Sequence, residues 1–308
     1  MAQVNMTHVK ELRERTQAGL NDCRAALVEA EGDMDKAVEI ILKKGLAKSA
    51  KRAGSVAAEG VVATRVAKDG KSAVAVEVNI QTDFAARNAD FLAFVERVVD
   101  VAEKADDGAD LSAQPFPGGG GTVEDQRAAL VGRLGENITV RRWKRLRVSS
   151  GRVTSYVHMG GKIAVLVGAQ TDSDKTASGV ESFLQDVAMQ VAAMNPPYLT
   201  VEDIPAAERA AQAEIYAAQL AEEGKIPQER RASVVDGKIA KWAKEVCLLQ
   251  QPSVIEPKKT VDELRADVAK QLSGEVTLLP FVRFERGEGI DVPTGGDFAA
   301  EVAAMAKG

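Results

Sequence analysis

Few residues in this chain have the types and spacing that catalytic chemistry requires. Its two histidines, His8 and His158, stand apart from any Cys, Asp or Glu spacing typical of a metal site or of a nucleophile paired with a base. The glycine run at 118–121 lacks the Lys and the Ser or Thr of a phosphate-binding loop. We therefore expect no catalytic centre, no metal site and no cofactor.

One short segment is unusual on physical grounds. Thr82-Asp83-Phe84 lies between the end of a predicted strand and the start of a predicted helix, so Phe84 is expected in a loop beside an acid. In one interpretation Asp83 or Asn88 caps the helix and Phe84 is a core anchor. In the other, Phe84 and Asp83 are exposed and insert an aromatic ring and a negative charge into a partner. Spacing alone does not choose between them.

Composition and charge limit the classes of protein to which this chain can belong. The chain has 308 residues and a formal net charge of −5, which disfavours a broad nucleic-acid surface. The basic run around Trp143 alternates with apolar residues and predicts a strand with a solvated face. Cys23 and Cys247 are far apart and are expected to be free and buried. No apolar run of about 18 residues occurs and the start is polar, so we expect no membrane span and a cytoplasmic protein.

The N-terminal part predicts a small helical module. Residues 5–45 carry three amphipathic stretches, the first ending before Gln17. Asn21 or Asp22 is expected to cap the second helix, and the third is expected to start at Asp33 and to end at Gly45. Residues 46–59 are then expected to form a linker.

An internal repeat follows the linker. Each copy is a predicted β-hairpin followed by a helix, with turns at Lys68–Lys71 and Met159–Lys162. The predicted strands and helices are 60–66, 73–83 and 89–105 in the first copy, and 152–158, 163–172 and 179–194 in the second. The repeat predicts two related α+β lobes rather than one parallel sheet.

Further elements are expected between and after the lobes. The Pro- and Gly-rich stretch at 106–121 is expected to hold no regular element and to form a flexible loop. Residues 204–223 and 228–249 predict an antiparallel helical hairpin, and 261–272 and 297–307 predict two more helices.

Several motifs along the chain resemble the signature segments of the elongation factor Ts family. They include Thr82-Asp83-Phe84 and Tyr156-Val157-His158, together with 9–16, 22–27, 161–166, 245–252 and 282–285. Their order spans almost the whole chain. The resemblance implies an α+β fold with an N-terminal module of the ubiquitin-associated type, two related lobes, an inserted helical hairpin and a C-terminal module. The expected boundaries are 1–45 for the module, 46–59 for the linker, 60–150 for lobe 1, 151–200 with 250–285 for lobe 2, 201–249 for the hairpin and 286–308 for the C-terminal module.

The resemblance also implies a function without enzymatic catalysis. Members of the family bind elongation factor Tu, drive off GDP and let GTP enter. Carried over by motif, Thr82, Asp83 and Phe84 would enter the GTPase near its magnesium site. Arg13 and Leu20 would touch its phosphate-loop side, and His158 would make a further contact.

Three departures from the family pattern are visible. Ala85 is smaller than the residue that usually follows Asp-Phe, Leu20-Asn21 replaces a more apolar pair, and the stretch at 106–121 has no familiar counterpart. Two other functions stay open at this stage: a scaffold whose three-helix module binds ubiquitin-like or nascent-chain partners, and a small-molecule enzyme with a site between the lobes. The sequence leaves open the exchange rate, the affinity, the species range of the partner and self-association through the helical hairpin.

Overall fold

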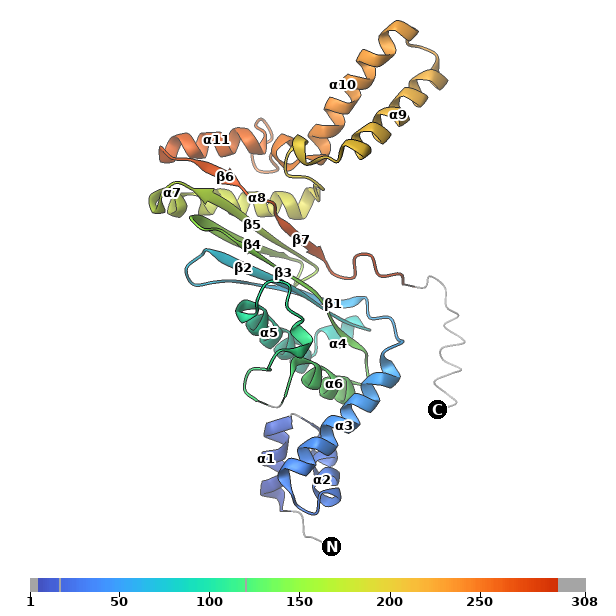
Figure 1. The fold of residues 1–308 in the computed structure, drawn as a ribbon, viewed down its shortest axis with the longest axis vertical. Coiled ribbons are helices and arrows are strands. Elements are labelled where there is room, and N and C mark those ends of the chain that lie inside the picture. Colours follow the sequence, from blue (N-terminus) through green and yellow to red (C-terminus); the bar gives the residue numbers. More distant parts are fainter. Residues whose placement is uncertain (1–4, 17, 120, 293–308) are drawn as a thin grey trace. The chain divides into compact units, whose positions relative to one another are not determined.

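The structure is a computed structural model that describes residues 5–16, 18–119 and 121–292 (Figure 1). Helices and antiparallel strands both occur, which confirms the predicted α+β class. The chain divides into two compact units. The first comprises Met1–Ala63, Val76–Arg142 and Glu285–Gly308, and the second comprises Thr64–Ala75 and Trp143–Phe284. The finer domain boundaries given above stay a prediction, and the predicted helix at 297–307 lies outside the described residues.

Three helices open the first unit: α1 (Met6–Thr16), α2 (Leu20–Glu29) and α3 (Met34–Arg52). Their apolar faces share one small core that includes Leu12 and Leu27, both fully buried. Asp33 caps α3, as expected, by accepting from the backbone amides of Asp35 and Lys36. The expected cap of α2 was wrong, because α2 already begins at Leu20 and neither Asn21 nor Asp22 precedes it.

The sequence predicted that helix α3 ends at Gly45. This prediction was wrong, because the helix continues to Arg52. Its buried positions Ala37, Ile41, Gly45 and Ser49 recur every four residues and form one stripe. The first two pack in the N-terminal core, whereas the last two face α6 (Val123–Leu134). A Cβ atom at Gly45 would lie 3.3 Å from the Cα atom of Ala129, so this glycine serves close helix packing and not termination.

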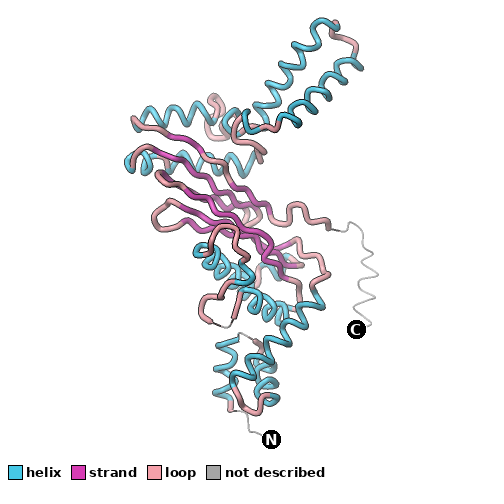
Figure 2. The backbone as a smooth tube through the Cα atoms, in the orientation of Figure 1, coloured by secondary structure: helices cyan, strands magenta, loops and turns pink. Residues whose placement is uncertain are grey.

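Strands β1 (Glu59–Val66), β2 (Ser72–Ile80) and β3 (Ile138–Arg147) form a sheet in the order β1-β2-β3, drawn in magenta in Figure 2. The basic run forms β3, as predicted. After β2 come the short helix α4 (Asp83–Ala86) and then α5 (Ala89–Lys104), whose apolar face is buried. Helix α6 was not predicted.

The stretch at 106–121 was expected to lack regular structure. Among its described residues it contains a short 3-10 helix, Leu111–Ala113, and Phe116 stacks on Phe94 of α5 with ring centroids 5.8 Å apart. An aromatic anchor thus holds part of this stretch against the first unit.

In the second unit, β4 (Gly151–His158) and β5 (Ile163–Thr171) pair antiparallel. Strand β6 (Val276–Leu278) pairs with the other edge of β5, and β7 (Val282–Glu285) also pairs with β5. Helices α8 (Glu181–Met194) and α11 (Val261–Leu272) contribute to the core beside this sheet, and the short helix α7 (Asp174–Gly179) contacts β4 and β5.

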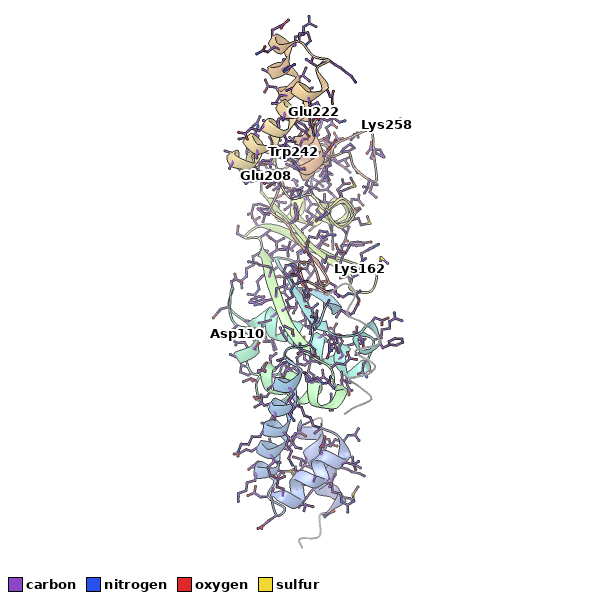
Figure 3. All side chains as sticks on the ribbon, turned by 90° about the vertical axis from the view of Figure 1, so that its right-hand side faces the viewer. Asp110, Lys162, Glu208, Glu222, Trp242 and Lys258 are labelled. Atoms are coloured by element: carbon purple, nitrogen blue, oxygen red, sulfur yellow. The ribbon has the colours of Figure 1, made fainter. Side chains whose placement is uncertain are left out.

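Helices α9 (Ala206–Glu223) and α10 (Gln228–Val246) form the predicted hairpin (Figure 1). At its base Ile204, Ala243 and Cys247 form a small core with Trp242 packed against it. Glu208 and Trp242, labelled in Figure 3, come from the two helices at this end of the hairpin. Cys23 and Cys247 are both free and buried, as expected. None of the described helices combines the length and apolarity needed to cross a membrane.

Candidate functional site

The segment that follows β2 forms a short capped turn. Thr82 precedes α4, and its side chain accepts a hydrogen bond from the Ala85 amide at 3.2 Å. Asn88 precedes α5 and accepts from the amides of Asp90 and Phe91. The chain therefore starts one helix, stops it after four residues and starts another.

Phe84 occupies the second position of α4, where the residue is 84% exposed. The interpretation of Phe84 as a core anchor was therefore wrong, and the ring is presented to solvent. Asp83 beside it is about half exposed and forms an ion pair with Arg87, with 3.2 Å between the Arg87 Nη2 and Asp83 Oδ2 atoms. The turn thus presents an aromatic ring together with an acid.

Glu136 contacts the base of this turn and was missed by sequence reasoning. Its carboxylate accepts from the Thr82 amide at 3.0 Å and from the Thr82 hydroxyl at 2.8 Å. The next residue, Asn137, donates from its backbone amide to the Gln81 side chain at 2.6 Å. No spacing rule links residues 81–82 to 136–137, so only the fold reveals this contact.

Inside β2, Glu77 is fully buried although it is an acid. It accepts from Arg141 at 3.0 Å, from Arg142, from Asn79 at 3.1 Å and from the backbone amide of Gly287 at 2.7 Å. Burial alone would raise the pKa of this carboxyl, but the hydrogen bonds from Gly287, Arg142 and Asn79 together hold the pKa below its ordinary value. The sequence signal was an acid between two valines of a largely apolar strand and a pair of arginines on a later strand.

The other predicted contact residues lie elsewhere. Arg13 is exposed on α1, and Leu20 is 43% exposed at the start of α2. His158 is exposed at the end of β4, where its Nδ1 atom lies 3.0 Å from the Tyr156 hydroxyl. Thr82, Asp83 and Phe84 are brought together in one turn, whereas Arg13 and Leu20 belong to the N-terminal helices and His158 belongs to the second unit.

A metal centre is not visible in the described part of the chain. Within residues 5–16, 18–119 and 121–292 no three His, Cys, Asp or Glu side chains are grouped so that they could hold a metal ion.

Comparison with known proteins identifies the class and the family. A family model described as Elongation factor TS matches residues 81–288. Relatives named Elongation factor Ts include the one from a Nitratiruptor species, 44% identical over 306 residues and 99% of both chains. The one from a type A strain of Clostridium perfringens is 43% identical over 96% of this chain and 97% of its own. The one from Nautilia profundicola is 44% identical over 99% of both chains.

The chain is therefore a translation elongation factor that acts in protein biosynthesis. It belongs to the elongation factor Ts family, whose members are nucleotide exchange factors.

Proposed function

We propose that this chain binds elongation factor Tu and promotes release of its GDP by inserting the Asp83-Phe84 turn beside the partner's magnesium and phosphate site. Phe84 wedges between helices of the GTPase, and Asp83 disturbs the polar network that holds the magnesium ion. GTP then rebinds to the emptied site. No covalent bond is made or broken in this exchange, and the chain works in the cytoplasm, where translation elongation takes place.

The physical requirement for such a factor is a preference for one state of the partner. It must bind the nucleotide-free GTPase more tightly than the nucleotide-loaded one, because only a differential affinity shifts an equilibrium. By reciprocity, GDP or GTP weakens binding of this chain by the same factor that this chain weakens nucleotide binding. Each tenfold change corresponds to about 1.4 kcal/mol of coupling.

The observation that carries the proposal is the 84% exposure of Phe84 on a capped turn. A large aromatic side chain that is exposed in the free protein gains most from burial in a partner, and aromatic anchors of this kind commonly dominate binding energy. Because Thr82 and Asn88 cap the helices on both sides, the ring stands on a defined backbone.

Further contacts complete the proposed interface. Arg13 and Leu20 on the N-terminal helices contact the phosphate-loop side of the GTPase, and His158 on β4 contacts it through the second unit. The exposure of Leu20 and the exposed position of His158 support these assignments. No direct contact with nucleic acid is part of the proposal, and self-association through the hairpin α9–α10 stays a prediction.

The test follows release of a fluorescent GDP analogue from elongation factor Tu, chased with unlabelled GDP. The full-length protein should accelerate release strongly, and Asp83→Ala and Phe84→Ala should each reduce that acceleration while binding to the nucleotide-free GTPase persists. Glu103→Ala, which removes a half-buried carboxylate near the far end of α5, serves as the control. No acceleration by the unaltered protein would refute the proposal and favour the scaffold alternative.

A further inference from the structure

We infer that Glu136 is a positioning residue, which fixes the direction in which the Thr82-Asp83-Phe84 turn presents its aromatic ring to the partner. This inference rests on the proposed function, since it assigns how the exchange turn is held. Glu136 itself does not need to touch the GTPase. It acts through Thr82.

The contact between the two residues is two-pronged. The Glu136 Oε2 atom accepts from the Thr82 backbone amide at 3.0 Å, and the Oε1 atom accepts from the Thr82 hydroxyl at 2.8 Å. Hydrogen bonds to an ionised acceptor are stronger than neutral ones, and two parallel bonds add geometric specificity. One bond would fix a distance, whereas two also restrict rotation of residue 82 about the contact.

The same hydroxyl passes this restraint to α4. Because its hydrogen points at Glu136, the Thr82 oxygen directs a lone pair to the Ala85 amide, which donates to it at 3.2 Å. The Thr82 carbonyl also accepts from the Ala86 amide at 3.0 Å. Thr82 therefore connects the carboxylate to the first turn of the helix that carries Phe84.

Helix α4 needs such an external restraint. It has four residues, of which Ala86 is the buried one. A single helical turn is not stable in isolation, because nucleation fixes several dihedral angles for one hydrogen bond. With little apolar burial of its own, the turn depends on its ends for a defined orientation.

The position of Glu136 is itself set by its neighbours. Gly135 ends α6 in the left-handed region at φ 75°, which turns the chain toward residues 81–82. Asn137, 7% exposed, donates from its amide to Gln81 at 2.6 Å and from its side chain to the Ser55 carbonyl at 2.8 Å. The carboxylate of Glu136 thus starts from an anchored backbone.

A purely stabilising role for Glu136 predicts a different outcome from a positioning role. Thr82 is exposed and Glu136 is half-buried, so the contact competes with water and contributes little to global stability. Its effect on the direction of Phe84 is larger, because the short helix α4 relies on the caps at its two ends for its orientation. Loss of Glu136 should therefore impair exchange more than it impairs folding.

The experiment measures exchange and stability on the same full-length variants. In the assay with elongation factor Tu and fluorescent GDP, Glu136→Ala should slow release about tenfold at subsaturating protein, and Thr82→Val should do nearly the same. Glu136→Gln keeps one good acceptor and should lose only about threefold. Thermal melting should change little, and the control Glu103→Ala should match the unaltered protein.

Combining variants separates positioning from other effects. In a Phe84→Ala background, Glu136→Ala should cause at most about a twofold further loss, because the ring that it orients is gone and only Asp83 of the turn remains to be positioned. A full tenfold loss in that background would overturn the inference. So would a loss in the single variant that simply parallels a fall in melting temperature.

A partner-free readout completes the test. Amide hydrogen exchange at Thr82 and Ala85 should rise at least tenfold in Glu136→Ala and stay unchanged in Phe84→Ala. If Phe84→Ala accelerates GDP release from elongation factor Tu as strongly as the unaltered protein does, the proposed function fails. If Phe84→Ala is slow while Glu136→Ala keeps both the unaltered release rate and unaltered amide protection, the inference alone fails.

Discussion

Strand β2 and the turn that follows it each contain a residue whose burial is unusual for its type. Glu77 is an acid with no exposed surface, whereas Phe84 is an aromatic residue that is 84% exposed. Acids are almost never fully buried unless paired, and large aromatic rings are usually buried. Within one stretch of the first unit, the charge lies inside and the ring outside.

The surroundings of the two side chains explain the difference. Glu77 receives hydrogen bonds from Arg141, Arg142, Asn79 and Gly287, so its burial is compensated within the chain. Phe84 gains little stabilisation from contacts within the folded chain, because most of the residue is exposed to solvent. The buried carboxylate of Glu77 thus serves the fold, whereas the exposed ring of Phe84 on its capped turn is available for the proposed contact with the partner. Removing each side chain should affect a different measurement.

The largest effect is expected from Glu77→Ala. It removes an acceptor that four donors share and should lower the free energy of unfolding by about 3 kcal/mol or more, as for other broken buried ion pairs. Chemical denaturation measures this change. Phe84→Ala is the matched comparison and should change stability by less than about 0.5 kcal/mol, as for other exposed positions. Equal losses in the two variants would show that Phe84 supports the fold as strongly as Glu77 does.

Phe84 should instead dominate exchange. Truncation to Ala should reduce the acceleration of GDP release about thirtyfold, corresponding to about 2 kcal/mol for an aromatic anchor. Phe84→Leu keeps an apolar side chain of smaller area and should lose less. If Leu and Ala behave alike, the shape of the ring and not its apolar area is what the partner reads.

Asn88 tests the same contrast between stability and nucleotide exchange, because it lies next to the turn but its side chain stabilises the fold. Its side chain caps α5, so Asn88→Ala should cost about 1 kcal/mol of stability. Asn88→Asp keeps the acceptor and should be nearly neutral. Exchange should stay close to that of the unaltered protein in both variants; a large loss with Asp would place Asn88 in the partner contact instead.

The smallest effect is expected from pH, because a proton removes only the charge of Glu77 and leaves its side chain in place. The folded pKa of Glu77 lies below its ordinary value of 4.5. The stabilisation that this carboxylate provides is therefore fully present above about pH 4.5 and is lost as the pH falls through the folded pKa. Unfolding free energies of the unaltered protein and of Glu77→Gln should differ by a constant amount from pH 7 to about 5 and should converge below that. Convergence already at pH 6 would contradict the lowered pKa.

Periodicity and turn chemistry were sufficient to predict most elements of the fold. Both hairpins, α5, α8, α11 and the pair α9–α10 lie close to their predicted ranges, because alternation and amphipathic spacing are strong there. Helix α6 was missed although Thr122 and Asp125 form a capping box at its start and Gly135 follows it. Gly45 was taken as a stop signal, but contact with α6 outweighed the weak helix propensity of glycine.

The candidate site was less accessible to sequence reasoning. A capping residue beside an aromatic one has the same spacing whether the ring is buried or exposed, so the exposure of Phe84 needed the structure. The contacts of Glu136 with Thr82 and of Arg141 with Glu77 join residues more than 50 positions apart. Such pairs depend on how strands and loops meet, which local pattern does not encode.

Because one buried stripe on α3 faces two different packing partners, the number of residues between its two halves sets how those halves are rotated about the helix axis. Ala37 and Ile41 face the N-terminal core, while Gly45 and Ser49 face α6 on the same side of one continuous helix. One residue inserted between Ile41 and Gly45 would turn the two halves of the stripe by about 100° relative to each other, since a helix has about 3.6 residues per turn. An insertion of about seven residues would nearly restore the phase. Length variation that a flexible linker would tolerate freely is thus confined here to whole turns.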